Sequence, residues 1–158
     1  MKTLRPAMLD HAALEALIPH RGPMCLLDRM TAWDETHIAC VAVNHRDPSH
    51  PLRTRSGLLA SASIEYAAQA AALHGALIAQ AAGGKALPGY LASARDVHLA
   101  TWRLDDLPEA EVDELQVRAE RQAGDATRLL YSFNVAHAGC EIAAGRLAVI
   151  LNAPVDPP

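Results

Sequence analysis

The chain opens with apolar residues at the spacing of a helix. They recur from Leu9 to Leu17, Asp10 stands where an N-cap is expected, and Pro19 ends the run. This pattern predicts a short amphipathic helix at about 8–18. The residues before it have a positive start but no apolar run, so they do not resemble a signal peptide.

The pattern then changes to one typical of strands and loops. Apolar residues with polar interruptions fill 24–31, and apolar and polar positions alternate over 36–44, which predicts the two strands of a hairpin. From 44 to 56 the residues are mainly Asn, His, Asp, Pro, Ser and Arg, which is the composition of a loop.

A long apolar helix is predicted at about 59–82, ending at Gly83 and Gly84. Alanines cover most of its circumference, and it lacks the charged stripe that faces water on a surface helix. We therefore expect a buried helix around which a β-sheet packs closely. Polar residues, among them Glu65, interrupt the apolar run, so a membrane span is not expected.

Four further strands are predicted, at about 88–100, 115–120, 130–135 and 141–151. The resulting order is a helix, two strands, the long helix and about four strands in a meander. This order indicates an α+β fold with a helix packed on an antiparallel sheet. The chain, 1–158, then forms one domain, and its tail, 152–158, is expected to be flexible.

Composition narrows the classes of function. The net charge is −4 and aromatic residues make up only 4% of the chain, so it lacks the basic face and the stacking platforms of nucleic-acid binders. Cys25, Cys40 and Cys140 are odd in number and show no CxxC spacing. This favours reduced cysteines in a cytoplasmic protein.

Three segments resemble the bacterial β-hydroxyacyl-acyl-carrier-protein dehydratases. Residues 18–30 read I-P-H-R-G-P-M-C-L-L-D-R-M and match that family's pattern P-H-R-x-P-x-x-x-x-D-R without a gap. Residues 65–70, E-Y-A-A-Q-A, are similar to its E-A-M-A-Q-A, and residues 90–92 to its Y-L-A. The I-E-Y-x-A-Q core at 64–69 resembles the divergent branch associated with aryl-polyene biosynthesis.

The resemblance implies the hotdog fold, in which a curved antiparallel sheet wraps a long helix. It implies dehydration of a 3-hydroxyacyl thioester to the trans-2-enoyl thioester in fatty-acid- or polyene-type biosynthesis, with no cofactor beyond the phosphopantetheine of the acyl carrier protein. Because the family's sites lie between two subunits, it also implies a homodimer or higher oligomer, or a heterodimer with another hotdog protein.

His50 and Glu65 are the catalytic residues that the resemblance implies. Dehydration needs a base for the C2 proton and an acid for the leaving 3-hydroxyl, and an imidazole with a carboxyl can do both. Glu65, among alanines, is expected to keep the proton that an acid needs. His50 as a solvated loop residue and Glu65 as an interface carboxylate are the alternatives, and His20, in the first motif, is the rival base.

Further residues are expected to bind substrate. Gln69 lies four positions after Glu65 on the same helix face, where it is placed to orient that carboxyl. The N–H groups of Ala60 and Ser61 open the helix and are expected to stabilise the enolate oxygen. Arg53 is a candidate for the phosphate or the acidic carrier. The segments 50–53 and 59–61 depart from the family's H-F-P-G and P-G-V.

Two other functions stay open. A hotdog thioesterase would use a helix carboxylate to hydrolyse the thioester, although the P-H-R segment disfavours it. A catalytically inactive subunit of a hotdog heterodimer would fit the altered helix entry and the displaced histidine. The remaining histidines, including His45 and His137, show no metal-ligand spacing, so no metal is assigned.

Overall fold

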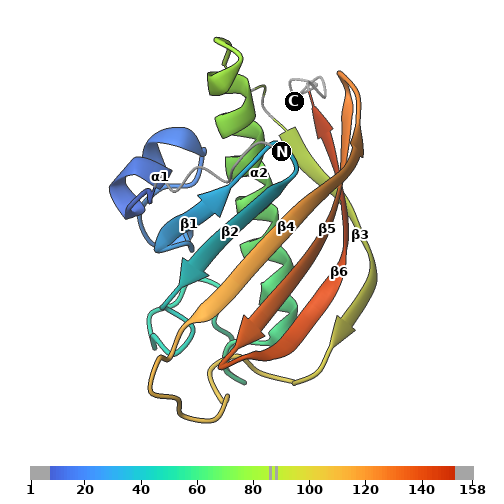
Figure 1. Cartoon of the computed structure of the whole chain (residues 1–158). Coiled ribbons are helices and arrows are strands. Elements are labelled where there is room, and N and C mark those ends of the chain that lie inside the picture. Colours follow the sequence, from blue (N-terminus) through green and yellow to red (C-terminus); the bar gives the residue numbers. More distant parts are fainter. Residues whose placement is uncertain (1–7, 86, 88, 152–158) are drawn as a thin grey trace, which may run out of the picture.

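A six-stranded antiparallel sheet curves around one long helix (Figure 1). This computed structural model describes residues 8–85, 87 and 89–151, and the predicted tail lies outside them. The arrangement is the hotdog fold expected from the sequence. Its sheet has the order β1-β2-β4-β5-β6-β3 and is open, with β1 and β3 at its edges. No helix in the described ranges has both the length and the apolar character needed to cross a membrane.

The two helices begin in different ways, α1 at a side-chain cap and α2 after a 3₁₀ turn. Helix α1 spans His11–Leu17, and the Asp10 side chain accepts a hydrogen bond from the Ala13 N–H at 3.0 Å, as an N-cap does. Helix α2 spans Ser63–Ala81. The 3₁₀ turn η2, Ala60–Ala62, forms the start of the range predicted for that helix.

The glycines after α2 end it in a Schellman motif. Gly83 has a φ of +78°, and its N–H donates to the Gln80 carbonyl at 3.0 Å. The Gly84 N–H donates to the Ala79 carbonyl at 2.9 Å. A residue without Cβ adopts the left-handed conformation at little cost, which explains why the helix stops here.

The strands are β1 Arg29–Trp33, β2 His37–Ala42, β3 Gly89–Leu99, β4 Leu115–Gly124, β5 Arg128–His137 and β6 Cys140–Leu151. The strand predicted from residue 24 begins later because a 3₁₀ turn, η1 at Gly22–Met24, comes first. The predicted meander of four strands is wrong for β3, which pairs with β6 and not with β4. The segment 100–114 carries the chain from that edge to the middle of the sheet.

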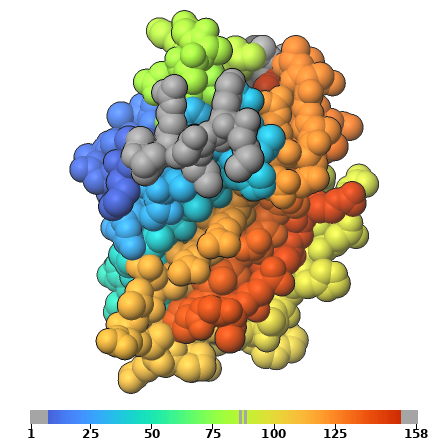
Figure 2. Space-filling view, in the orientation of Figure 1, coloured from blue at the N-terminus to red at the C-terminus, as the bar shows by residue number. Residues whose placement is uncertain are grey.

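The inner face of the sheet and α2 together form the core. Alternate residues of β4 and β5 are buried, as their periodicity predicts. They pack against the small residues of α2, which let the sheet approach closely. Figure 2 shows the opposite, outer face, where side chains of β4, β5 and β6 form the surface and most of α2 lies behind them.

Candidate active site

One face of α2 lines an apolar groove of about 490 Å³. Its other walls come from the ends of α1, β4 and β6 and from the starts of β3 and β5. Residues from Glu65 to Ala79 line it along the helix, so it extends about 21 Å at 1.5 Å per residue. Side chains on this helix face are small, among them Ala68, Ala72 and Gly75, which leaves room for an extended apolar ligand.

Glu65 and His20 meet in this groove. His20 Nε2 lies 3.3 Å from Glu65 Oε1, and the two side chains are 28% and 33% exposed. Glu65 is therefore more open to solvent than its alanine-rich surroundings suggest. His20 Nδ1 is buried, with no hydrogen-bond partner among the described residues. The rival base of the sequence analysis is thus the histidine that this chain places beside the predicted acid.

Gln69 fixes this pair by joining the helix to the first motif. Its Nε2 donates to Glu65 Oε1 at 3.2 Å and to the Met24 carbonyl at 2.8 Å. Its Oε1 accepts from the Leu26 N–H at 2.9 Å. The fully buried amide thereby links the segment that follows His20 to the helix turn that carries Glu65.

His50 belongs to a different, closed network. It is buried, and its Nδ1 accepts from the Leu52 N–H at 3.1 Å. The neutral ring therefore carries its proton on Nε2, which donates to the Tyr66 hydroxyl at 2.9 Å. Tyr66 in turn donates to Asn44 Oδ1 at 2.6 Å. Within one chain, both ring nitrogens of His50 are occupied, and neither is hydrogen-bonded to Glu65.

Burial keeps this network uncharged. Desolvation lowers the pKa of His50 and raises the pKa of Tyr66. His50 is accordingly a neutral hydrogen-bond donor. A role as base at Nε2 would need the other tautomer, with the proton on Nδ1, where the Leu52 N–H now donates, so the predicted catalytic role of His50 stays a prediction.

The other residues predicted to bind substrate differ in whether their polar groups already have a partner in the protein. The Ala60 N–H donates to the Trp102 carbonyl at 2.9 Å and is therefore not available to an enolate oxygen. Ser61 is exposed at the helix entry. Arg53 lies 3.3 Å from Asp105, a carboxylate that Arg103 also binds.

Sequence reasoning missed the groove and the partner of His50. Small residues along a helix predict close packing, and nothing in their spacing distinguishes a packed face from one that lines a groove. Tyr66 follows Glu65 directly, so its side chain points to another face of the helix, where the loop at 44–50 lies against it.

Comparisons with known proteins agree with this fold. A protein-family model described as ApeP-like, ApeP dehydratase, matches residues 12–156. The chain resembles the dehydratase heterocomplex ApeI:P from Xenorhabdus doucetiae, with a TM-score of 0.76 and 20% identity over 89% of this chain and 91% of that chain. It also resembles a mutant thioesterase from Pseudomonas aeruginosa, with a TM-score of 0.57 and 15% identity over 90% and 94% of the two chains. Structural likeness at such identities shows the fold alone, and no curated protein sequence matches.

Proposed function

Because the chain belongs to the ApeP-like dehydratase family, we propose that it removes water from a 3-hydroxyacyl thioester carried on an acyl carrier protein. The product is the trans-2-enoyl thioester. The observation that carries this proposal is the pair of Glu65 and His20, 3.3 Å apart, in a groove lined mainly by apolar residues. The groove suits an acyl chain, and the pair supplies the two proton-transfer groups that the reaction needs.

The two groups suit a reaction at adjacent carbons. His20 Nε2 takes the C2 proton, the C2 electrons form the C2=C3 bond, and the C3–O bond breaks. Glu65 gives its proton to the departing hydroxyl, which leaves as water. A proton then passes from His20 to Glu65 across the 3.3 Å contact and restores the starting state. The Ser61 N–H is the remaining candidate donor to the thioester oxygen.

This assignment gives the role of base to His20, with Gln69 as the residue that positions Glu65. His50, the base that the family resemblance implies, would have to meet Glu65 from a neighbouring subunit. Its hydrogen bond to Tyr66 at 2.9 Å would first have to break. The saturation of both its ring nitrogens favours His20.

We infer that a second hotdog chain pairs with the free edge of β3. This strand has eleven residues and pairs only on its β6 side among the described residues. Tyr90, Leu91 and Leu99 on it are 40–49% exposed. A long unpaired edge with exposed apolar side chains favours pairing with another chain. The similarity to the ApeI:P heterocomplex supports a different hotdog protein as the partner, and a second copy of this chain is the alternative.

The carrier protein is expected to contact arginines near this edge. Arg95, Arg128 and Arg146 come from β3, β5 and β6 and line a second hollow of about 490 Å³. Clustered positive charge suits an acidic carrier and the phosphate of its phosphopantetheine. Arg53, the earlier candidate, does not line this hollow and pairs at 3.3 Å with the buried carboxylate of Asp105, whereas Arg146 pairs at the same distance with the exposed carboxylate of Asp96.

Glu65→Gln tests the proposal. Gln keeps the size of the side chain and its contact with Gln69 but cannot deliver the proton, so we expect the dehydration rate to fall by about 100-fold or more. Glu141→Gln makes the same change at an exposed position of β6 and should keep the full rate. A Glu65→Gln protein that is folded and as fast as the control would show that the acid has been misassigned.

A further inference from the structure

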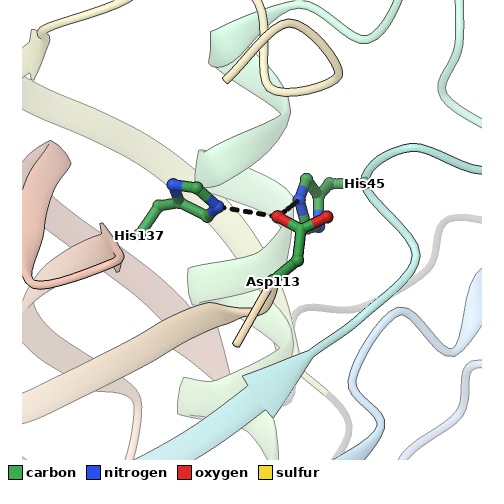
Figure 3. A group of neighbouring side chains, drawn as sticks. All are labelled: His45, Asp113 and His137. Atoms are coloured by element: carbon green, nitrogen blue, oxygen red, sulfur yellow. Dashed lines mark hydrogen bonds and ion pairs between the residues drawn. The ribbon is translucent and has the colours of Figure 1, made fainter. Parts of the chain in front are cut away.

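Two histidines and a carboxylate from three separate segments meet at one end of the sheet (Figure 3). His45 follows β2, Asp113 precedes β4, and His137 ends β5. His45 Nε2 lies 3.2 Å and His137 Nε2 2.8 Å from the same oxygen, Asp113 Oδ1. The two imidazoles are 1% and 3% exposed, whereas Asp113 is a third exposed and opens the cluster to solvent.

Asp113 Oδ1 has more hydrogen-bond donors around it than it has lone pairs to accept them. In addition to the two imidazoles, Arg46 Nη2 lies 3.0 Å from Asp113 Oδ1. A carboxylate oxygen offers about two lone-pair sites, so three N–H groups compete for them. A cation held between the imidazole nitrogens and Oδ1 would replace two of these N–H contacts by coordinate bonds and remove the competition.

We propose that His45, Asp113 and His137 bind one divalent transition-metal ion, with Zn²⁺ as the best fit. Tetrahedral zinc, with bonds of about 2.0–2.2 Å, holds neighbouring ligand atoms about 3.3 Å apart. The three ligand atoms here already lie within 4.8 Å of one another, and two of the separations are 3.2 and 2.8 Å. Imidazole nitrogen with one carboxylate oxygen suits zinc better than calcium or magnesium, which prefer all-oxygen shells.

The surroundings hold the carboxylate ligand in one orientation. Arg46 binds the second oxygen, Oδ2, most closely, at 2.6 Å, and so orients the carboxylate from outside the first coordination sphere. The carboxylates of Asp105 and Glu109 offset its positive charge.

A metal here would join three parts of the chain that are far apart in sequence. It would tie the segment after β2 to the start of β4 and the end of β5. Asn44, next to His45, accepts the hydrogen bond of Tyr66, so the ion would also stiffen the loop that carries His50. The proposed role is structural and does not depend on the dehydratase reaction.

Metal titration of the full chain, freed of any histidine tag and pre-treated with a chelator, tests the site. We expect Co²⁺ to bind at one equivalent and give the intense visible bands of four-coordinate cobalt, and Zn²⁺ to displace it and raise the Tm by several degrees. His137→Gln and Asp113→Asn should each weaken Zn²⁺ binding by at least about 100-fold, beyond the usual 10–100-fold loss of a second-shell partner.

His98→Gln is the matched control, because it removes a histidine of β3 outside the cluster and should bind Zn²⁺ as the original chain does. Circular dichroism checks that each variant is folded. The proposal is overturned if the original chain binds neither ion saturably, a result that needs no variant. It is also overturned if both cluster variants bind Zn²⁺ as tightly as the control.

Discussion

The state of a histidine in this chain depends on what its two ring nitrogens already contact. His50 accepts a backbone N–H at Nδ1 and contacts a hydroxyl at Nε2, so its neutral ring carries the proton on Nε2 and both nitrogens have partners. His20 has a carboxylate at Nε2 and lines the groove. The same residue type is thus a structural donor at one position and a candidate base at the other.

His20→Gln and His50→Gln should therefore separate activity from stability. His20→Gln removes the base, and we expect the dehydration rate to fall by about 100-fold with little change in unfolding free energy. His50→Gln disturbs a buried hydrogen-bond chain and should cost about 1–3 kcal/mol of stability while the folded fraction stays active. Rate assays and urea unfolding of both variants measure the dehydration rate and the unfolding free energy. The reverse pattern, with His50→Gln folded but inactive, would restore His50 as the base.

The contacts of individual side chains were predictable where they follow from spacing along the sequence. Glu65 and Gln69 lie four positions apart on a helix, and their hydrogen bond follows from that spacing. The Ala60 N–H could not be judged in this way because its acceptor, the Trp102 carbonyl, comes from a distant loop. The contact between His20 and Glu65 is equally non-local. Glu65 stands out as a carboxylate on an alanine-rich helix, whereas only the family pattern brought His20 under consideration.

Among the elements, α2 and its flanking loop hold neutral histidines that make stability sensitive to pH. Burial lowers the pKa of His45, His50 and His74. In the unfolded chain these groups bind protons below about pH 6.5, so the unfolded state gains protons that the folded state does not. Stability should therefore be fully present above pH 7 and decrease below about pH 6.5, by up to about 1.4 kcal/mol per pH unit for each histidine.

Urea unfolding between pH 8 and pH 5 checks this dependence, with His74→Gln as the comparison. His74 Nε2 donates to the Asp34 carbonyl and its Nδ1 accepts from Tyr131, both at 2.8 Å, and an amide can replace both contacts. Loss of one of the three titrating histidines should reduce the change of unfolding free energy per pH unit by about a third. If this change is the same in the variant, or if the original chain shows no such change, these histidines do not govern the acid transition.

The small-residue face of α2 predicts how the groove limits its ligand. Ala72 lies two helix turns from Glu65, about 10 Å along the axis, and Ala79 lies about 21 Å away. Ala72→Phe should lower kcat/KM for a long 3-hydroxyacyl substrate by about 10-fold or more and leave a short one nearly unchanged. Ala79→Phe should affect only the longest chains. Equal losses for all lengths would mean that the acyl chain does not follow this groove.

Element types were largely predictable from periodicity, and their partners were not. The alternation along β4 and β5 and the glycine stop of α2 are local signals, and the structure follows them. The pairing of β3 with β6 depends on how the segment 100–114 crosses the fold, which no local pattern encodes. The strand predicted from residue 24 was wrong at its start because Gly22, with a φ of +54°, opens a turn.

For the whole molecule, the free edge of β3 predicts assembly with another chain. Leu99→Asp places a charge on this edge outside the groove, and we expect it to weaken the dimer by at least about 10-fold. Leu130→Asp makes the same change at a similarly exposed position of β5, a strand paired on both sides, and should leave assembly intact. Light scattering coupled to size-exclusion chromatography, with the chain alone and with a hotdog partner, compares the two. Equal assembly of both variants would place the interface elsewhere.

The Glu65–His20 pair is proposed to dehydrate a carrier-bound 3-hydroxyacyl group. Mass spectrometry of a 3-hydroxyacyl carrier protein incubated with the chain, alone and with a hotdog partner, measures this reaction itself. We expect the carrier to lose the mass of one water and Glu65→Gln to prevent this loss. Release of the acyl group as a free acid would instead indicate a thioesterase. Water loss only with the partner, and undiminished in Glu65→Gln, would show that this chain is the inactive subunit.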